Sequence, residues 1–217
     1  MPWEKQFDEH QVLDQAMRTF MARGFEATSI QDLVDSMDLN RGSIYATFGD
    51  KRSLFLKTLA HYEMHHRQAW FAALRQNHTP RDAILSVFEG AIATALSDRG
   101  RFGCFLVNSA IELSPHDDDV AEVVAEGLTN TEKSFRDLIK EGKKIGEIPP
   151  HVDPTTTARV LLGLLVGLRV LARGRPERPL LKALADQASA LLRQRRLPAK
   201  PPGFRQAAFS KTGKGEL

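Results

Sequence analysis

Residues 28–51 read TSIQDLVDSMDLNRGSIYATFGDK and contain the pattern of two short helices. Four apolar residues of the first half recur on one helical face: Ile30, Leu33, Val34 and Met37. This spacing predicts a helix of about two turns, with Thr28 and Gln31 as a cap pair at its start. Asn40 is a good N-cap for a second helix, on which Ile44 and Phe48 lie four apart and face the first helix.

The outer face of the second helix carries no large aliphatic side chain. It consists of Arg41, Gly42, Ser43, Tyr45, Ala46 and Thr47. A helix with short polar residues at its N-terminus can enter the major groove of DNA, while its partner helix crosses the backbone above it. The two helices therefore predict a helix-turn-helix.

These residues resemble the DNA-binding domain of TetR-family transcriptional regulators. The central stretch of that family reads roughly small-V-S-K/R-G-T/S-L/I-Y-x-x-F-x-S/D-K. This chain matches it in order at Leu39, Asn40, Arg41, Gly42, Ser43, Ile44, Tyr45, Phe48, Asp50 and Lys51. One departure is Asp38, where the family usually has Gly in the turn. Asp tolerates a left-handed backbone better than most residues, so we expect the turn to form.

Helical spacing continues on both sides of this stretch. Apolar residues from Val12 to Met21 predict a first helix that ends at Gly24. Because three short helices bury little core alone, a long helix from Asp50 to about Gln76 is expected to carry them onto a larger body. Further helices are predicted from Pro80 and over 102–113, 117–145, 155–173 and 178–193. No segment shows the period-2 alternation of a sheet.

The resemblance implies an all-α fold of nine helices in this order. The helix-turn-helix bundle corresponds to residues 1–50, and a larger ligand-binding and dimerisation domain to residues 51–196. The tail, residues 197–217, is basic and rich in Pro and Gly, and we expect it to be disordered.

Composition limits the kinds of protein that this chain can be. The 217 residues are 42% hydrophobic, which is enough for a sizeable core, and the single cysteine excludes an internal disulfide framework. The most apolar run, residues 160–168, is too short for a membrane span, and the N-terminus has no signal-peptide core, so we expect a cytoplasmic protein without membrane contact. The net charge of +3 does not locate a DNA-binding end, since residues 1–50 hold four basic and nine acidic side chains.

The resemblance and the helix geometry together predict a double-stranded DNA operator as partner. Arg41 and Ser43 are expected to read base edges, Ala46 to touch a thymine methyl, and Gly42 to let the backbone come close. Lys51 lies in the first turn of a helix, where a cation is unfavourable unless an anion is nearby, which indicates a phosphate contact. The remaining members of the predicted site are Thr28, Ser29, Tyr45 and Thr47, with phosphate contacts assigned to Thr28, Tyr45 and Thr47.

The larger domain is expected to bind a small apolar or aromatic effector and to form a homodimer on a palindromic operator. The predicted pocket residues are Phe88, Ile92, Phe102, Cys104, Phe105, Asn108, Ile111, Leu128, Phe135 and Leu165. The predicted dimer interface comprises Gly163, Gly167, Leu184 and Leu191. Effector binding is expected to shift the long fourth helix, which changes the separation of the two DNA-binding helices.

Two other candidate sites have competing interpretations. Cys104 lies among aromatic residues near a predicted helix start, so it is either an inert buried thiol or a sensor of oxidants and electrophiles. His61 and His65 lie four apart, with Glu63 and His66 nearby, which is half of a metal site. No second Cys or His cluster completes it in the sequence, so we expect ordinary helix residues and no metal or cofactor.

Two alternatives remain: an all-helical enzyme or small-molecule binder without DNA, and a protein-interaction module whose helix-turn-helix serves packing. The polar face from Arg41 to Thr47 argues against the second. The sequence has no nucleophile elbow, P-loop or dinucleotide-binding fingerprint, so we do not expect an enzyme.

Overall fold

The computed structural model describes residues 7–97 and 100–193, and the predicted disordered tail lies outside them. Within these residues every regular element is helical, in agreement with the expected all-α class. The elements are α1 (Glu9–Arg23), α2 (Ile30–Met37), α3 (Arg41–Phe48), α4 (Lys51–His61), the π-helix η1 (Tyr62–Gln68), α5 (Ala69–Asn77), α6 (Pro80–Ala95), the 3-10 helix η2 (Gly100–Phe102), α7 (Phe105–Glu112), α8 (Asp118–Lys144), α9 (Pro154–Gly174) and α10 (Arg178–Leu191).

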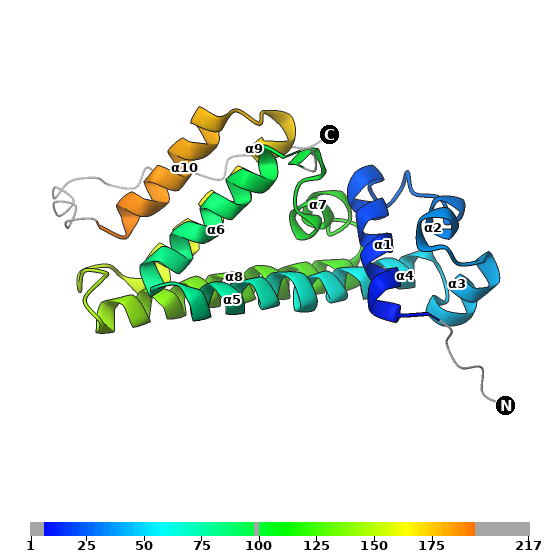
Figure 1. Ribbon diagram of the computed structural model, residues 1–217, viewed down its shortest axis with the longest axis horizontal. Helices are drawn as coiled ribbons and strands as arrows, with labels where there is room; N and C mark the ends of the chain where they lie inside the picture. The colour runs from blue at the N-terminus through cyan, green and yellow to red at the C-terminus, as the bar shows by residue number, and fades with distance from the viewer. Residues whose placement is uncertain (1–6, 98–99, 194–217) are drawn as a thin grey trace, which may run out of the picture.

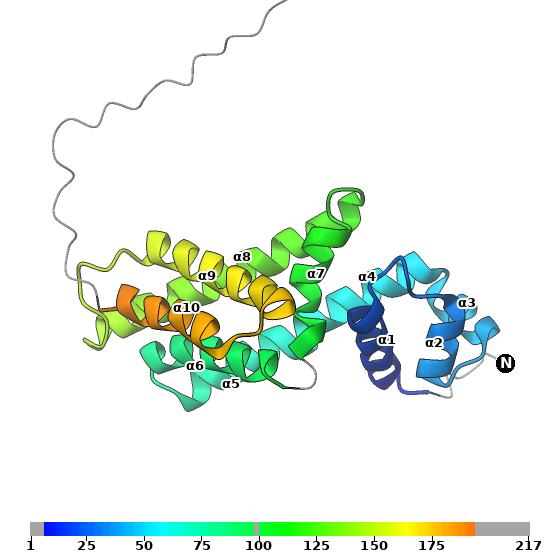
Figure 2. The same ribbon diagram turned by 90° about the horizontal axis from the view of Figure 1, so that it is seen from above.

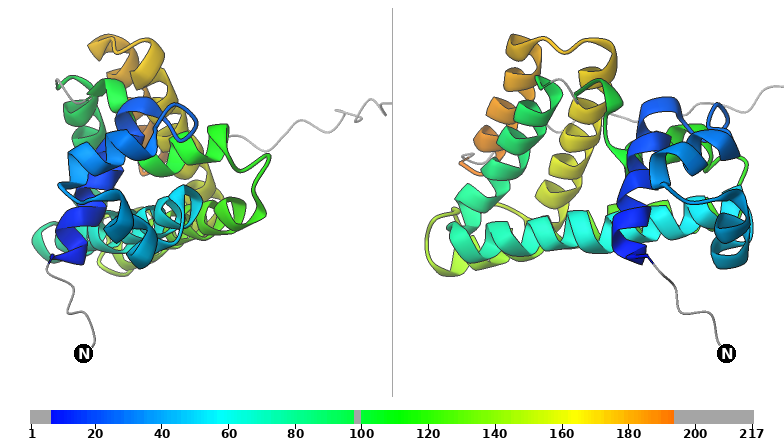
Figure 3. Two further views of the ribbon diagram at one scale, coloured as in Figure 1. Left: turned by 90° about the vertical axis from the view of Figure 1, so that its right-hand side faces the viewer. Right: turned by 45° about the vertical axis from the view of Figure 1, so that its right-hand side comes forward.

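The helices α4, η1 and α5 follow one another without a break and form one rod, as Figure 1 shows. Counted with this rod as one helix and without the short 3-10 helix η2, the described part of the chain has the nine helices that the resemblance implies. The helices α1, α2 and α3 gather at one end of the rod, and α8 lies along it (Figures 1 and 2). On the other side of the molecule α6, α9 and α10 pack together above the rod, which is clearest in the right-hand view of Figure 3.

The core of the three-helix bundle continues into α4, α7 and the first part of α8. The fully buried ring of Phe20 on α1 meets Phe55 on α4 edge to face, with the ring centroids 5.0 Å apart. Phe55 in turn contacts Phe105 at the start of α7, 5.2 Å away. Edge-to-face aromatic pairs of this kind add about 0.5–1.5 kcal/mol beyond the burial of their area. A displacement of α4 or α7 is therefore transmitted to the bundle through packed rings.

The turn between α2 and α3 forms as the sequence predicts. Asp38 adopts a left-handed conformation, with φ 51° and ψ 40°, and its backbone N–H bonds the Val34 carbonyl at the end of α2. Asn40 then caps α3 by accepting a hydrogen bond from the backbone N–H of Ser43, 2.8 Å away. Ile44 and Phe48 are buried beneath α3, which confirms the predicted inner face of this helix.

The predicted cap of α2 is wrong by one residue. Ser29, not Thr28, is the N-cap, and it forms a capping box with Asp32, whose carboxylate accepts hydrogen bonds from the Ser29 backbone and hydroxyl. Both residue pairs have the required spacing, but the charged Asp32 side chain is the stronger acceptor and also pairs with Arg23 at 2.9 Å. Thr28 is buried and donates its hydroxyl to the Gly24 carbonyl instead.

Helix α9 is long and apolar enough to cross a membrane by length and composition alone. In the structure it packs closely against α8, α6 and α10, and Leu161, Leu165 and Leu168 on its inner face are buried. This packing is that of a core helix in an α-helical bundle.

Candidate DNA-binding site and effector cavity

Within the described residues the outer face of α3 is largely open to solvent. Arg41, Gly42 and Ala46 are exposed, Tyr45 is 45% exposed, and no hydrogen bond or ion pair engages the side chains of Arg41 or Tyr45 within the described residues. The predicted members Ser43 and Thr47 are half-buried at the edges of the same face. Since Ile44 and Phe48 anchor the opposite face, α3 presents a slim polar surface that a major groove can accept.

Lys51 lies in the first turn of α4, as expected, but its side chain has partners within the protein. Its ammonium donates hydrogen bonds to the backbone carbonyls of Phe25 and Thr28, at 2.9 and 3.0 Å, and lies 4.3 Å from the centroid of the Phe25 ring. The negative partner that a cation needs in the first turn of a helix is therefore a pair of carbonyl oxygens within the protein. These contacts favour a structural role for Lys51, which fastens the loop after α1 to the start of α4, over the expected phosphate contact.

Thr28 is also displaced from the predicted site. Its side chain is 1% exposed, so it cannot reach a phosphate without unfolding the start of α2. Ser29 is exposed at the same end of α2, with its hydroxyl engaged by Asp32.

A cavity of about 390 Å³ lies where η1, α5, α6, α7, α8 and α9 meet. Its wall is largely aromatic and aliphatic, with a few polar groups, a composition typical of a small-molecule site. The lining residues are Tyr62, His66, Arg67, Trp70, Phe71, Gly90, Thr94, Cys104, Val107, Leu128, Thr131, Leu162, Leu165, Val166 and Arg169. Because η1 belongs to the rod, this cavity shares a wall with the helix that reaches the DNA-binding bundle.

Only three of the ten predicted pocket residues line this cavity: Cys104, Leu128 and Leu165. Phe88, Phe105 and Phe135 are instead packed in the core, and Ile92 borders a second depression beside α10. Asn108 is buried and donates to the Phe102 carbonyl, and neither residue lines the cavity, while Ile111 is 63% exposed on the outside of α7. Seven of the ten residues lie outside this cavity because apolar spacing selects core residues and does not distinguish a packed face from a hollow one.

The cavity contains two guanidinium groups that the sequence reasoning missed. Arg67 pairs with the buried Glu63 at 3.1 Å and also donates to the Thr131 hydroxyl. Arg169 has no ion-pair or hydrogen-bond partner among the residues that the structure describes. The signal in the sequence was its place inside the apolar run of α9, where a lone arginine calls for a polar partner.

Cys104 faces the same cavity from the start of α7. Its thiol is buried and lies 3.4 Å from the Tyr62 hydroxyl. Burial raises the pKa of the Cys104 thiol, but Arg169, Arg67 and the contact with Tyr62 outweigh it and lower the pKa below its usual value. A thiol in this setting is more nucleophilic at neutral pH than an ordinary buried cysteine.

Residues 7–97 and 100–193 leave one face of α9 uncovered. Val160 and Val170 are 43% and 42% exposed, and a Cβ added to Gly163 or Gly167 between them would meet nothing within 4 Å. These four residues follow one another at spacings of three and four, so they form one stripe along the helix. Leu184 and Leu191 on α10 are half-buried against the core of the larger domain.

The fold and these two sites define a helix-turn-helix regulator with a separate small-molecule cavity. A family model described as bacterial regulatory proteins, tetR family, matches residues 12–58, and one described as tetracyclin repressor-like, C-terminal domain, matches residues 80–196. The chain belongs to the TetR family of bacterial regulatory proteins. It is a DNA-binding transcriptional regulator, and its family and relatives are regulators rather than enzymes.

The relatives and the solved structures agree with this assignment. The chain is 31% identical over 170 residues to the transcriptional repressor ComR of Escherichia coli, and the match covers 78% of this chain and 81% of ComR. It is 32% identical over 171 residues to the regulator YezE of Bacillus subtilis, covering 78% and 88%. A cysteine mutant of CifR, complexed with 26-bp double-strand operator DNA, is 28% identical with a TM-score of 0.74, and the match covers 86% of this chain and 98% of CifR.

Proposed function

We propose that this chain is a ligand-responsive repressor that binds a palindromic operator as a homodimer and is released by a small molecule. The observation that carries the proposal is the exposed polar face of α3, held in place by buried Ile44 and Phe48. The operator complex of CifR and the printed role of ComR as a repressor support the DNA partner and the sign of regulation. A protein with this role acts in the cytoplasm, where the DNA is.

Within this proposal the base readers are Arg41 and Ser43, and Ala46 contacts a thymine methyl. Tyr45 and Thr47 contact phosphates on either side, and Gly42 allows close approach of the helix to the DNA. Thr28 and Lys51 are assigned to the scaffold for the reasons given above.

The stripe on α9 provides the surface for the dimer. Gly163 and Gly167 let a second helix approach closely, and Val160 and Val170 supply apolar area at both ends of the contact. A two-fold axis along this surface presents two copies of α3, which matches the two half-sites of a palindromic operator.

The cavity points to the chemical class of the effector. Its aromatic and aliphatic wall fits an apolar skeleton. Arg169 has no ion-pair or hydrogen-bond partner among the described residues, and with Arg67 in the same wall it fits a carboxylate or another anionic group. We infer a small aromatic or aliphatic acid. Binding shifts the position of η1 within the rod and thereby favours a state that does not fit the operator.

A thiol-sensing function is the second candidate. The observation that favours it is the place of Cys104 in the cavity wall, with a lowered pKa and Tyr62 beside it. An electrophile that enters the cavity would then act on the same rod as a reversible effector. Cys104→Ser distinguishes the two functions, because it leaves release by a carboxylic acid unchanged and abolishes release by an alkylating agent.

Operator binding tests the proposed function directly. The purified chain is expected to shift a fragment of its own promoter, and the logarithm of the binding constant should fall linearly with the logarithm of salt concentration. An unrelated fragment of equal length is the control and should bind more weakly by about three orders of magnitude or more. Equal affinity for both fragments would contradict a specific regulator.

Arg169→Gln tests the effector class. A panel of small aromatic and aliphatic carboxylic acids is expected to include ligands that release the operator from the wild-type protein, and the substitution should weaken their effect about 10-fold or more, because it removes a charge-assisted hydrogen bond. Arg173→Gln, an exposed neighbour on α9, is the matched control. Release by neutral amides at the same concentrations in both proteins would contradict an anionic effector.

A further inference from the structure

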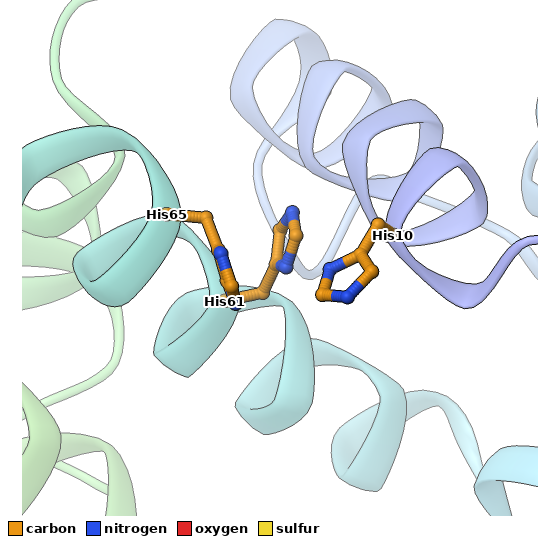
Figure 4. A group of neighbouring side chains, drawn as sticks. All are labelled: His10, His61 and His65. Carbon is orange, nitrogen blue, oxygen red and sulfur yellow. The ribbon is translucent and has the colours of Figure 1, made fainter. Parts of the chain in front are cut away.

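Three histidines, one from α1 and two from the rod, lie together at the junction between the DNA-binding bundle and the rod. His10 lies in the first turn of α1, His61 ends α4 and His65 lies in η1, as Figure 4 shows. The ring centroids are 5.3 Å apart for His10 and His61, 4.7 Å for His10 and His65, and 4.8 Å for His61 and His65. One ring nitrogen of each lies within 4.8 Å of those of the other two.

A carboxylate orients the central histidine of this group. Asp14, one turn after His10 on α1, accepts hydrogen bonds on Oδ1 from Nε2 of His61 at 2.9 Å and from Nε2 of His66 at 2.7 Å. This arrangement holds the proton of His61 on Nε2 and leaves the lone pair on Nδ1. Metal-binding histidines in proteins usually donate their second ring N–H to such a carboxylate.

The π-helix explains why so many histidines face α1. In an α-helix His65 would share a face with His61, but His66 would point away from it. Hydrogen bonds between residues five apart widen the turn in η1, so that His65 and His66 lie on either side of His61 and both reach α1. Single π-helical turns are frequent at functional sites and cost backbone energy that α-helical geometry would avoid.

We propose that His10, His61 and His65 bind a divalent transition-metal ion such as Zn²⁺, with Asp14 as the outer partner of His61 and water as the fourth ligand. Zinc–nitrogen bonds of about 2.0–2.1 Å place the nitrogens of one tetrahedral ion roughly 3.3 Å apart. The spacing in the structure exceeds this by an amount that side-chain rotation of the exposed His10 and His65 can close.

The chemistry of the three side chains selects the class of ion. Imidazole nitrogen is a preferred ligand of zinc, copper, nickel and iron, whereas magnesium and calcium prefer oxygen. The ion would join α1 of the DNA-binding bundle to the π-helix that lines the effector cavity.

Metal titration of the full-length chain without a polyhistidine tag tests this site, in the absence of DNA. Calorimetry with Zn²⁺ is expected to give one ion per chain, and Co²⁺ to give the intense visible absorption of a tetrahedral complex. His10→Ala and His65→Ala, both at exposed positions, should each weaken binding about 10-fold or more, and Asp14→Asn by about 10–100-fold. Mg²⁺ should produce no heat of binding at the same concentrations.

His116→Ala and His151→Ala are the matched controls, because both side chains are exposed and distant in sequence from the cluster. Both control proteins should bind Zn²⁺ as the wild type does. Unchanged zinc affinity in His10→Ala and His65→Ala, or no binding by the wild type, would overturn the proposed metal site. Since no operator is present, this result is independent of the proposed repressor function.

Discussion

Arg41→Ala and Tyr45→Ala should each weaken operator binding by about 10–100-fold and leave thermal unfolding unchanged. Neither side chain has a hydrogen-bond or ion-pair partner among the described residues, so removing it costs the folded chain little, within about 0.5 kcal/mol. On DNA each loses a contact worth about 1–3 kcal/mol. Mobility shifts at fixed salt and thermal melts of the same preparations measure the two quantities.

The two variants should differ in their effect on the specificity of DNA binding. Arg41→Ala removes a base contact, so it should also relax the preference for the operator over unrelated DNA, whereas Tyr45→Ala should weaken both complexes alike. Arg178→Ala, an exposed arginine at the start of α10, is the control and should bind as the wild type does. If the Arg41→Ala, Tyr45→Ala double variant binds the operator as the wild type does, α3 is not part of the DNA interface.

Lys51→Met should destabilise the DNA-binding bundle by about 1.5–3 kcal/mol. Methionine keeps the apolar stem against Phe25, but it removes the ammonium and leaves the carbonyls of Phe25 and Thr28 without their charged donor. The operator affinity should fall as a consequence, and low temperature or a stabilising osmolyte should recover part of it. Urea unfolding followed by circular dichroism measures the free energy of unfolding.

Lys57→Met is the matched control for this experiment. Lys57 also reaches a carbonyl and an aromatic ring, but its contact with Thr47 is 3.4 Å long, its distance to the Phe48 ring is 5.3 Å, and its side chain is exposed. Its loss should cost about 0.5 kcal/mol or less. If Lys51→Met unfolds like the wild type yet fails to bind the operator, Lys51 is a phosphate contact and the structural role assigned to it is wrong.

Local features of the sequence were sufficient for the helix-turn-helix. The cap at Asn40, the turn at Asp38 and the buried pair Ile44 and Phe48 all depend on neighbours within a few residues, and the structure contains each of them. The one error in the helix caps of this region, at the start of α2, arose between two adjacent residues with the same cap spacing.

The cavity and the histidine cluster could not be predicted in the same way. Arg67 and Arg169 line one cavity only because η1 and α9 both border it, and the tilt of a helix is set by packing rather than by spacing. His10 lies far from His61 in sequence. The π-helical turn that brings His66 beside His61 has no simple sequence pattern. The sequence therefore showed half of the cluster, and the structure supplied the residues of α1.

Hydroxyl-radical footprinting on the selected operator tests most directly whether two copies of α3 read DNA together. We expect two protected segments whose centres lie a whole number of helical turns apart, about 10–10.5 bp for one turn, with two chains bound per site. Both segments should disappear together in the Arg41→Ala, Tyr45→Ala double variant. A single protected segment, or protection by one chain that survives these substitutions, would contradict the account.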